Sequence, residues 1–210
     1  MKLIKYTGLA VLLAGSAFTA QNAMAVEISA NAGVASAYLW RGQNLSNGSA
    51  AISADVTASQ NGAYATMWTS SGDDAAGQEY DLIVGYGGEA GKVSYDVSAV
   101  TYIYPQDNTD FGDLSDLVVS VGYGPATLTH YDNIAGGSGT GYTTLSGDVG
   151  KVTALVGVTN GQDNANYSHL DVTYNYNDRL SFTASKVVDK DDDAMDDSTN
   201  VVAAYSLPLK

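Results

Sequence analysis

The chain contains no cysteine, and it has few prolines and few basic residues. Without cysteine, disulfides and thiolate metal sites are excluded, so no covalent crosslink holds the fold together. Its three prolines, at positions 105, 125 and 208, fall in predicted loops or near the chain end, where a missing N–H breaks no strand pairing. After residue 25 the sequence lacks any run of roughly 18 apolar residues, so no transmembrane helix is expected.

Basic residues are scarce in a strongly acidic chain. Nine Lys and Arg stand against 23 Asp and Glu, and two of the nine, Lys2 and Lys5, lie within the first 25 residues. Such a charge repels the phosphate backbone of nucleic acids. Nucleic acid is therefore not expected as a partner.

Residues 1–25 have the three parts of a secretory signal peptide. Lys2 and Lys5 form a basic start, GLAVLLA (8–14) is a short apolar core, and AMA (23–25) is a small-x-small cleavage site. The apolar core is too short to span a bilayer as a helix. We predict removal of 1–25, which leaves residues 26–210 as one domain.

The dominant pattern in the remaining chain is alternation with period two. In AISADVTAS (51–59), Ile52 and Val56 share one face, and Asp55 and Thr57 lie on the other. Side chains alternate in this way along an extended strand. Twelve such segments are predicted as strands, at 27–40, 50–59, 63–70, 79–87, 92–104, 115–123, 126–132, 141–147, 151–159, 167–176, 180–188 and 199–207.

The breaks between these segments alternate in length. Tight breaks such as QNG (60–62) and NDR (177–179) alternate with longer acidic ones such as 105–113 and 189–198. Short turns at one end and longer loops at the other are typical of outer-membrane barrels. The predicted fold is therefore all-β, an antiparallel up-and-down transmembrane β-barrel of about 12 strands. A soluble periplasmic β-sandwich, which also alternates, is the alternative. The small residues and tyrosines of the apolar face favour the barrel.

In this barrel the side chains on the polar face of each strand are expected to point into a water-filled lumen. Trp40 is expected to face lipid at the outer rim, and Arg41 is expected to point into the mouth, near Asp81 or Asp96. The residues predicted to line the pore are Arg41, Asp55, Asp81, Asp96, Asp171, Tyr64, Trp68, Tyr102 and Tyr104.

Other sequence motifs give only weak evidence for a metal site or a catalytic site. Asp189, Asp191 and Asp193 open like a calcium-binding loop, but Ala194 and Asn200 replace the Gly and Glu that such a loop needs, so they are weak candidates for a divalent cation. The two histidines, at 130 and 169, have no serine singled out beside them. No enzymatic activity, bound metal or cofactor is expected.

The segment NAGVASAYLWRGQNLSNGSAAISADV (31–56), followed by GAYATMWTSS and YDLIVGYGG, resembles the TorF family of porins. The matching residues are Asn31, Val34, Ser36, Tyr38, Trp40, Arg41, Gly42, Ser46, Tyr64 and Trp68. This resemblance implies an outer-membrane β-barrel with porin activity.

The expected function is passive diffusion of small hydrophilic solutes across the cell outer membrane. The acidic lumen and loops predict a preference for cations. Outer-membrane lipid and lipopolysaccharide are the expected surroundings, and no oligomeric state is predicted. Two alternatives remain open: a closed structural or adhesive surface barrel filled by its own side chains, and a soluble periplasmic β-sandwich that binds a ligand.

Overall fold

The computed structural model describes residues 26–137, 139–161, 166–193 and 195–209. The predicted signal peptide at 1–25 lies outside the described residues. Within the described part of the chain, no helix has the length and apolar character needed to cross a membrane.

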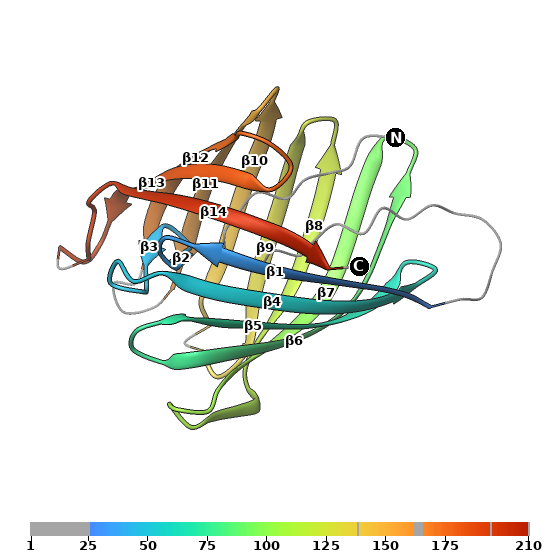
Figure 1. Ribbon diagram of the computed structural model, residues 1–210, viewed down its shortest axis with the longest axis horizontal. Coiled ribbons are helices and arrows are strands. Elements are labelled where there is room, and N and C mark those ends of the chain that lie inside the picture. Colours follow the sequence, from blue (N-terminus) through green and yellow to red (C-terminus); the bar gives the residue numbers. More distant parts are fainter. Residues whose placement is uncertain (1–25, 138, 162–165, 194, 210) are drawn as a thin grey trace.

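Twelve strands close into one antiparallel barrel, in which each strand pairs with the barrel strands that precede and follow it along the chain, and the last pairs with the first (Figure 1). The short strands β2 and β3 lie between β1 and β4 in sequence and are not part of the barrel. This confirms the predicted 12-strand barrel, and the β-sandwich alternative is wrong because one closed sheet replaces two packed ones. The barrel strands are β1 (Glu27–Ala35), β4 (Ala51–Gln60), β5 (Ala63–Asp73), β6 (Gly77–Ala90), β7 (Val93–Tyr104), β8 (Thr109–Tyr123), β9 (Ala126–Ala135), β10 (Gly141–Val149), β11 (Val152–Asn160), β12 (Tyr167–Asn175), β13 (Leu180–Lys190) and β14 (Asn200–Leu209).

Tight turns set the register of the sheet at one end of the barrel. Between β4 and β5, Asn61 and Gly62 have φ angles of 51° and 89°. Positive φ at both central residues gives the two-residue turn whose twist matches that of paired strands. At the seam, Val34 of β1 pairs with Tyr205 of β14. The closed ring leaves no unpaired edge among the twelve strands.

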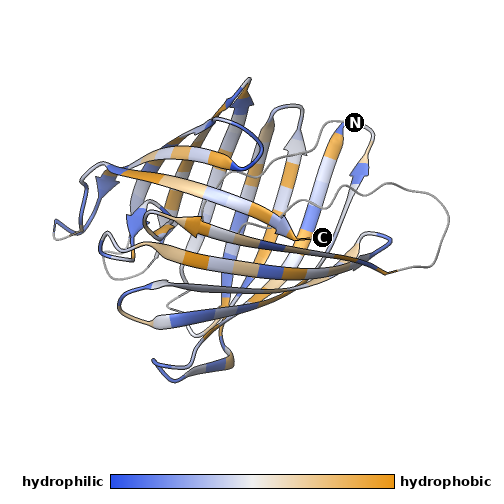
Figure 2. Ribbon diagram, viewed as in Figure 1, coloured by the Kyte–Doolittle hydropathy of each residue, from blue (hydrophilic) through white to orange (hydrophobic). Residues whose placement is uncertain are grey.

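The apolar face of the sheet is outside and the polar face is inside. On β4, Ile52 and Val56 are 65% and 52% exposed, whereas Asp55 and Thr57 are 5% and 8% exposed. The same alternation of hydropathy runs along the other strands (Figure 2). Hydroxyl pairs join neighbouring strands inside the barrel, such as Thr57 with Thr66 at 2.8 Å. The barrel is therefore the reverse of a soluble protein, which buries its apolar side chains.

The interior is not polar throughout. Ile83, Val100, Tyr102 and Val118 pack together on the inner face of β6, β7 and β8. Part of the inner wall is thus an apolar cluster, where the sequence led us to expect a polar lumen. The same alternation that places Asp81 inside also places Ile83 inside, because both have the same parity on β6.

The first predicted strand, 27–40, is two elements rather than one. β1 ends at Ala35, and β2 (Leu39–Trp40) pairs with β3 (Gln43–Asn44) in a separate two-stranded sheet. We call residues 39–44 the inner hairpin. The expectation that Trp40 faces lipid is wrong, because Trp40 packs against the cluster of Tyr38, Ala51 and Trp68 on the inner side of the wall.

Candidate functional site

The inner hairpin is a tight turn held at its base. Arg41 and Gly42 form its tip, with φ angles of 47° and 85°, the geometry of a type I′ turn. At its base, the Tyr38 N–H donates to Ser46 Oγ at 2.7 Å, and the Leu45 N–H donates to the Tyr38 carbonyl at 2.8 Å. These bonds present Arg41 at the end of a short, closed loop.

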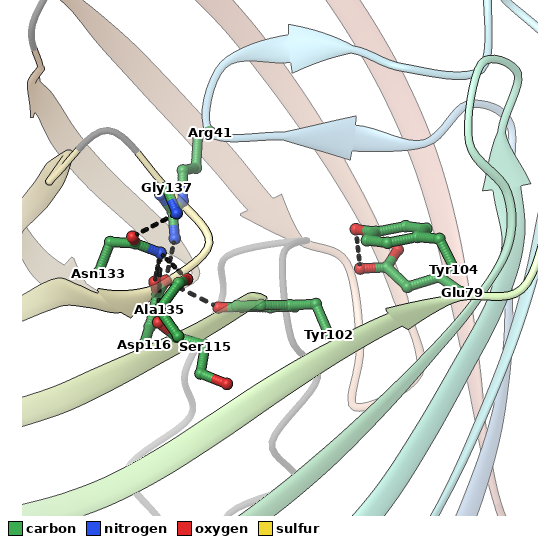
Figure 3. A network of polar contacts seen from close by, with 9 residues as sticks. All are labelled: Arg41, Glu79, Tyr102, Tyr104, Ser115, Asp116, Asn133, Ala135 and Gly137. Atoms are coloured by element: carbon green, nitrogen blue, oxygen red, sulfur yellow. Dashed lines mark hydrogen bonds and ion pairs between the residues drawn. The ribbon is translucent and has the colours of Figure 1, made fainter. Parts of the chain in front are cut away.

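Arg41 reaches from the inner hairpin to the barrel wall (Figure 3). Its Nη2 donates to Asp116 Oδ2 on β8 at 3.0 Å, and the side chains of the pair are 10% and 6% exposed. The guanidinium carbon also lies 4.6 Å from the ring centre of Tyr142, 5.1 Å from that of Tyr131 and 4.4 Å from that of Trp40. The predicted partners Asp81 and Asp96 are therefore wrong; the partner is Asp116.

The Asp116 carboxylate is fixed from several sides. Tyr102 Oη donates to Oδ2 at 3.0 Å, and Asn133 Nδ2 donates to Oδ1 at 3.0 Å. Asn133 also donates to the carbonyls of Ser115 and Ala135. The register between β8 and β9 shifts between Ser115 and Asp116. Irregularities of this kind re-aim a side chain, and here the shift occurs at the carboxylate that receives Arg41.

A second set of contacts holds the other side of the turn. Tyr167 Oη donates to the Arg41 carbonyl at 2.9 Å. His169 is 1% exposed, with its Nε2 2.7 Å from Tyr142 Oη and its Nδ1 3.0 Å from Asp171 Oδ1. Asp171, which the sequence predicted to line the pore, thus contacts His169, the histidine next to the turn.

The turn has no space for a side chain at Gly42. A Cβ there would lie 2.5 Å from His169 Cγ, whereas a Cβ on Gly48, which also has positive φ, would meet nothing within 4 Å. We expect Gly42→Ala to lower the free energy of unfolding by more than Gly48→Ala, which carries only the backbone cost of about 1 kcal/mol. Urea unfolding of both variants in detergent measures the difference. Equal losses would show that Gly42 does not need to approach His169 closely.

Carboxylates and aromatic rings gather on the wall formed by β5, β6 and β7. Glu79 Oε1 accepts from Tyr104 Oη at 2.7 Å (Figure 3). Glu79 Oε2 accepts from Tyr38 Oη at 2.6 Å. Asp81 is 1% exposed and lies in register between Trp68 and Tyr102. Its Oδ1 has no hydrogen-bond partner among the described residues.

The remaining predicted residues lie on the same inner face but are separate from Arg41. Asp55 accepts from Asn31 Nδ2 at 3.2 Å, and Asp96 accepts from Tyr64 Oη at 3.0 Å. Their role in lining a pore stays a prediction. Five further residues of the site were not predicted from the sequence: Glu79, Asp116, Tyr131, Tyr142 and Tyr167. The alternation of side chains along a strand identifies Glu79 and Asp116 as inner residues. Glu79 lies on the same face of β6 as Asp81, and Asp116 lies on the same face of β8 as Ser120.

The acidic segment after β13 stays in the exposed loop region. Asp189, which the sequence placed in the loop, is instead part of β13 and pairs with Ser168, whereas Asp191 and Asp193 follow the strand. All three are exposed, and Asp191 accepts from Asn166 Nδ2 at 2.8 Å. Nearby, hydrogen bonds from the backbone and hydroxyl of Ser198 lower the pKa of Asp196. Across the part of the chain that the structure describes, no three His, Asp or Glu side chains are grouped to hold a metal ion.

The solved structures similar to this chain include two mutant forms of the Rh. blastica porin. They are 13% and 14% identical to this chain, each with a TM-score of 0.46, and the matches cover 75% of this chain. The chain spans 55% of the length of each porin. No curated protein matches this sequence.

A family model matches residues 19–198, which is most of the chain. The match includes all barrel strands from β1 to β13 and the whole inner hairpin. The resemblance to TorF porins stays an expectation. This chain belongs to the Gcw_chp family, described as bacterial proteins of unknown function.

Proposed function

We propose that the protein is a porin of the bacterial outer membrane, through which small hydrophilic solutes diffuse passively. The observation that carries the proposal is the reversed distribution of polarity: a closed barrel with Ile52 and Val56 exposed outside and Asp55 and Thr57 inside. Strands can cross a bilayer only when the sheet closes, because hydrocarbon offers no partner to an edge. An apolar exterior suits lipid, and a polar interior suits water.

The exposed aromatic residues support a membrane position. Tyr86, Tyr95, Tyr123 and Tyr174 are exposed on the outer face near the short turns. Tyrosine rings favour the boundary between hydrocarbon and water. In this arrangement the longer acidic loops face the cell exterior, where lipopolysaccharide surrounds the barrel.

The charges of the interior support a preference for cations. Asp55, Glu79, Asp81, Asp96 and Asp171 lie on the inner face. Arg41 is the basic group that the inner hairpin brings among them, and its charge is paired with Asp116. Rings of carboxylates attract cations and repel anions in a narrow pore. The inner hairpin and the aromatic side chains around it would form the narrowest part.

Conductance in a planar bilayer tests this function. The refolded protein, first shown to be folded by heat-modifiable migration on a gel, is studied under a KCl gradient. We expect discrete current steps and a reversal potential with the sign for cation selectivity. An anion-selective potential would contradict the assigned role of the carboxylates. Absence of steps from inserted, folded protein would instead support a closed structural barrel.

A further inference from the structure

We propose that Asp116, Tyr131 and Tyr142 form a binding site for the guanidinium group of a small solute, and that Arg41 occupies this site as an internal ligand. The proposal deepens the porin function and rests on it for its physiological meaning, since it names a class of solute. It also gives the inner hairpin a role, as an occupant that such a solute displaces.

The contacts of Arg41 are those that a guanidinium ligand would make. A carboxylate oxygen lies 3.0 Å from Nη2, and two phenol rings lie 4.6 Å and 5.1 Å from the guanidinium carbon. A planar, delocalised cation stacks on aromatic faces while it donates to a carboxylate. An ammonium group is compact and strongly hydrated, so it would use the carboxylate but not stack in the same way.

The wall supplies these groups without help from the inner hairpin. Asp116 is on β8, Tyr131 on β9 and Tyr142 on β10, three strands that pair directly with one another. Asn133 and Tyr102, also on the wall, orient the carboxylate. Rigid groups already in place bind a ligand without a further ordering cost. The site would therefore persist when Arg41 leaves.

Arg41, in contrast, comes from a small element. The inner hairpin has two-residue strands joined by only two registered pairs, Leu39 with Asn44 and Trp40 with Gln43. The Arg41 side chain fills the space between Asp116 and the rings of Tyr131 and Tyr142. Withdrawal of the turn therefore leaves room for a ligand with the shape of a guanidinium group. The tethered arginine acts at a high effective concentration and competes with free solute.

Binding of ethylguanidinium to the full chain tests the proposal. Trp40 stacks beside the guanidinium of Arg41, and the chain has two tryptophans, so Trp68→Phe in every variant leaves Trp40 as the reporter. We expect Arg41→Ala to show saturable quenching or shift of Trp40 fluorescence, and the protein that keeps Arg41 to bind roughly tenfold more weakly because the tethered side chain competes. Ethylammonium at the same ionic strength is expected to bind more weakly than ethylguanidinium.

Two matched carboxylate variants locate the site. In the Arg41→Ala background, Asp116→Asn should abolish saturable binding, whereas Asp55→Asn, which changes another inner carboxylate, should preserve it. Arg41→Lys retains a charge on the turn and should bind ethylguanidinium with intermediate strength, which provides a second variant if Arg41→Ala does not fold.

Absence of saturable binding by folded Arg41→Ala or Arg41→Lys would overturn the proposal, as would binding that survives Asp116→Asn or that ethylammonium matches. The titration requires no ion current. Saturable binding by a protein that conducts nothing would therefore support the guanidinium site and contradict the porin function, and a conducting protein without binding would do the opposite.

Discussion

Deleting residues 37–46, which include the inner hairpin, is expected to raise the single-channel conductance severalfold. The deletion removes Arg41 and the rings of Tyr38 and Trp40 from the interior, so the narrowest part of the pore should widen. Ala35 pairs with Ala51 at the ends of β1 and β4, and the five residues left between them suffice for an ordinary hairpin loop. The barrel strands themselves are unchanged.

Planar-bilayer recording of the deletion variant beside the unaltered protein measures the change. A deletion within the acidic loop at 191–199 is the control, because it shortens an outer loop and leaves the inner hairpin in place. Its conductance should remain close to that of the parent. An unaltered conductance in the folded, inserted 37–46 deletion would show that the constriction lies elsewhere, for example at the apolar cluster of Ile83, Val100 and Val118.

Asp116→Ala is expected to lower the free energy of unfolding by about 3–5 kcal/mol, the usual loss when one partner of a buried ion pair is removed. Arg41 would keep its aromatic contacts but lose its carboxylate while it is 10% exposed, and Tyr102 and Asn133 would lose their acceptor. Urea unfolding in detergent, followed by tryptophan fluorescence, measures the loss.

A compensating pair and an exposed control make this measurement specific. The double variant Arg41→Met with Asp116→Leu should recover part of the stability, because it leaves no unpaired buried charge, whereas Tyr102 and Asn133 still lack their acceptor. Asp107→Ala, in the exposed turn after β7, should change stability little. If Asp116→Ala unfolds at the same urea concentration as the parent, the pair with Arg41 contributes nothing to the folded state.

The barrel was predictable because alternation and turn chemistry are local. Val56 next to Asp55 and Thr57 specifies which way each side chain faces, and Asn61-Gly62 specifies a tight turn. These signals recur along the chain, so the number of strands followed from counting them. The interior apolar cluster follows the same alternation, because Ile83 lies on the same face of β6 as Asp81, and Val118 lies on the same face of β8 as Asp116.

The inner hairpin was not predictable from the same signals. Tyr38 and Trp40 continue the alternation of β1, so periodicity extends the strand beyond Ala35, where the chain actually turns inward. Its turn is Arg41-Gly42, and a type I′ turn with arginine at the first position lacks the usual Asn or Asp. Tertiary contacts compensate for the positive φ of Arg41, and local sequence does not encode them.

The partner of Arg41 depends on how the whole sheet closes. Asp116 lies 75 positions away in sequence, and its approach requires the register of β8 and the curvature of the barrel. Parity alone could identify inner carboxylates, and it led us to name Asp81 and Asp96. Choosing Asp116 among them required knowledge of height along the strand, which alternation does not supply.

The contacts of the inner hairpin also imply an order of events in folding. The hairpin lies near the start of the barrel sequence, yet its contacts reach residues far along the chain. Arg41 contacts Tyr167, 126 positions later, and Asn44 contacts Asn200, 156 positions later. Contacts that close long loops form only after the intervening chain has been arranged. The hairpin should therefore dock last, after β12 and β14 have joined the sheet. The fluorescence of Trp40 should then change after the strands have formed, and the time of this change would report when the barrel is complete.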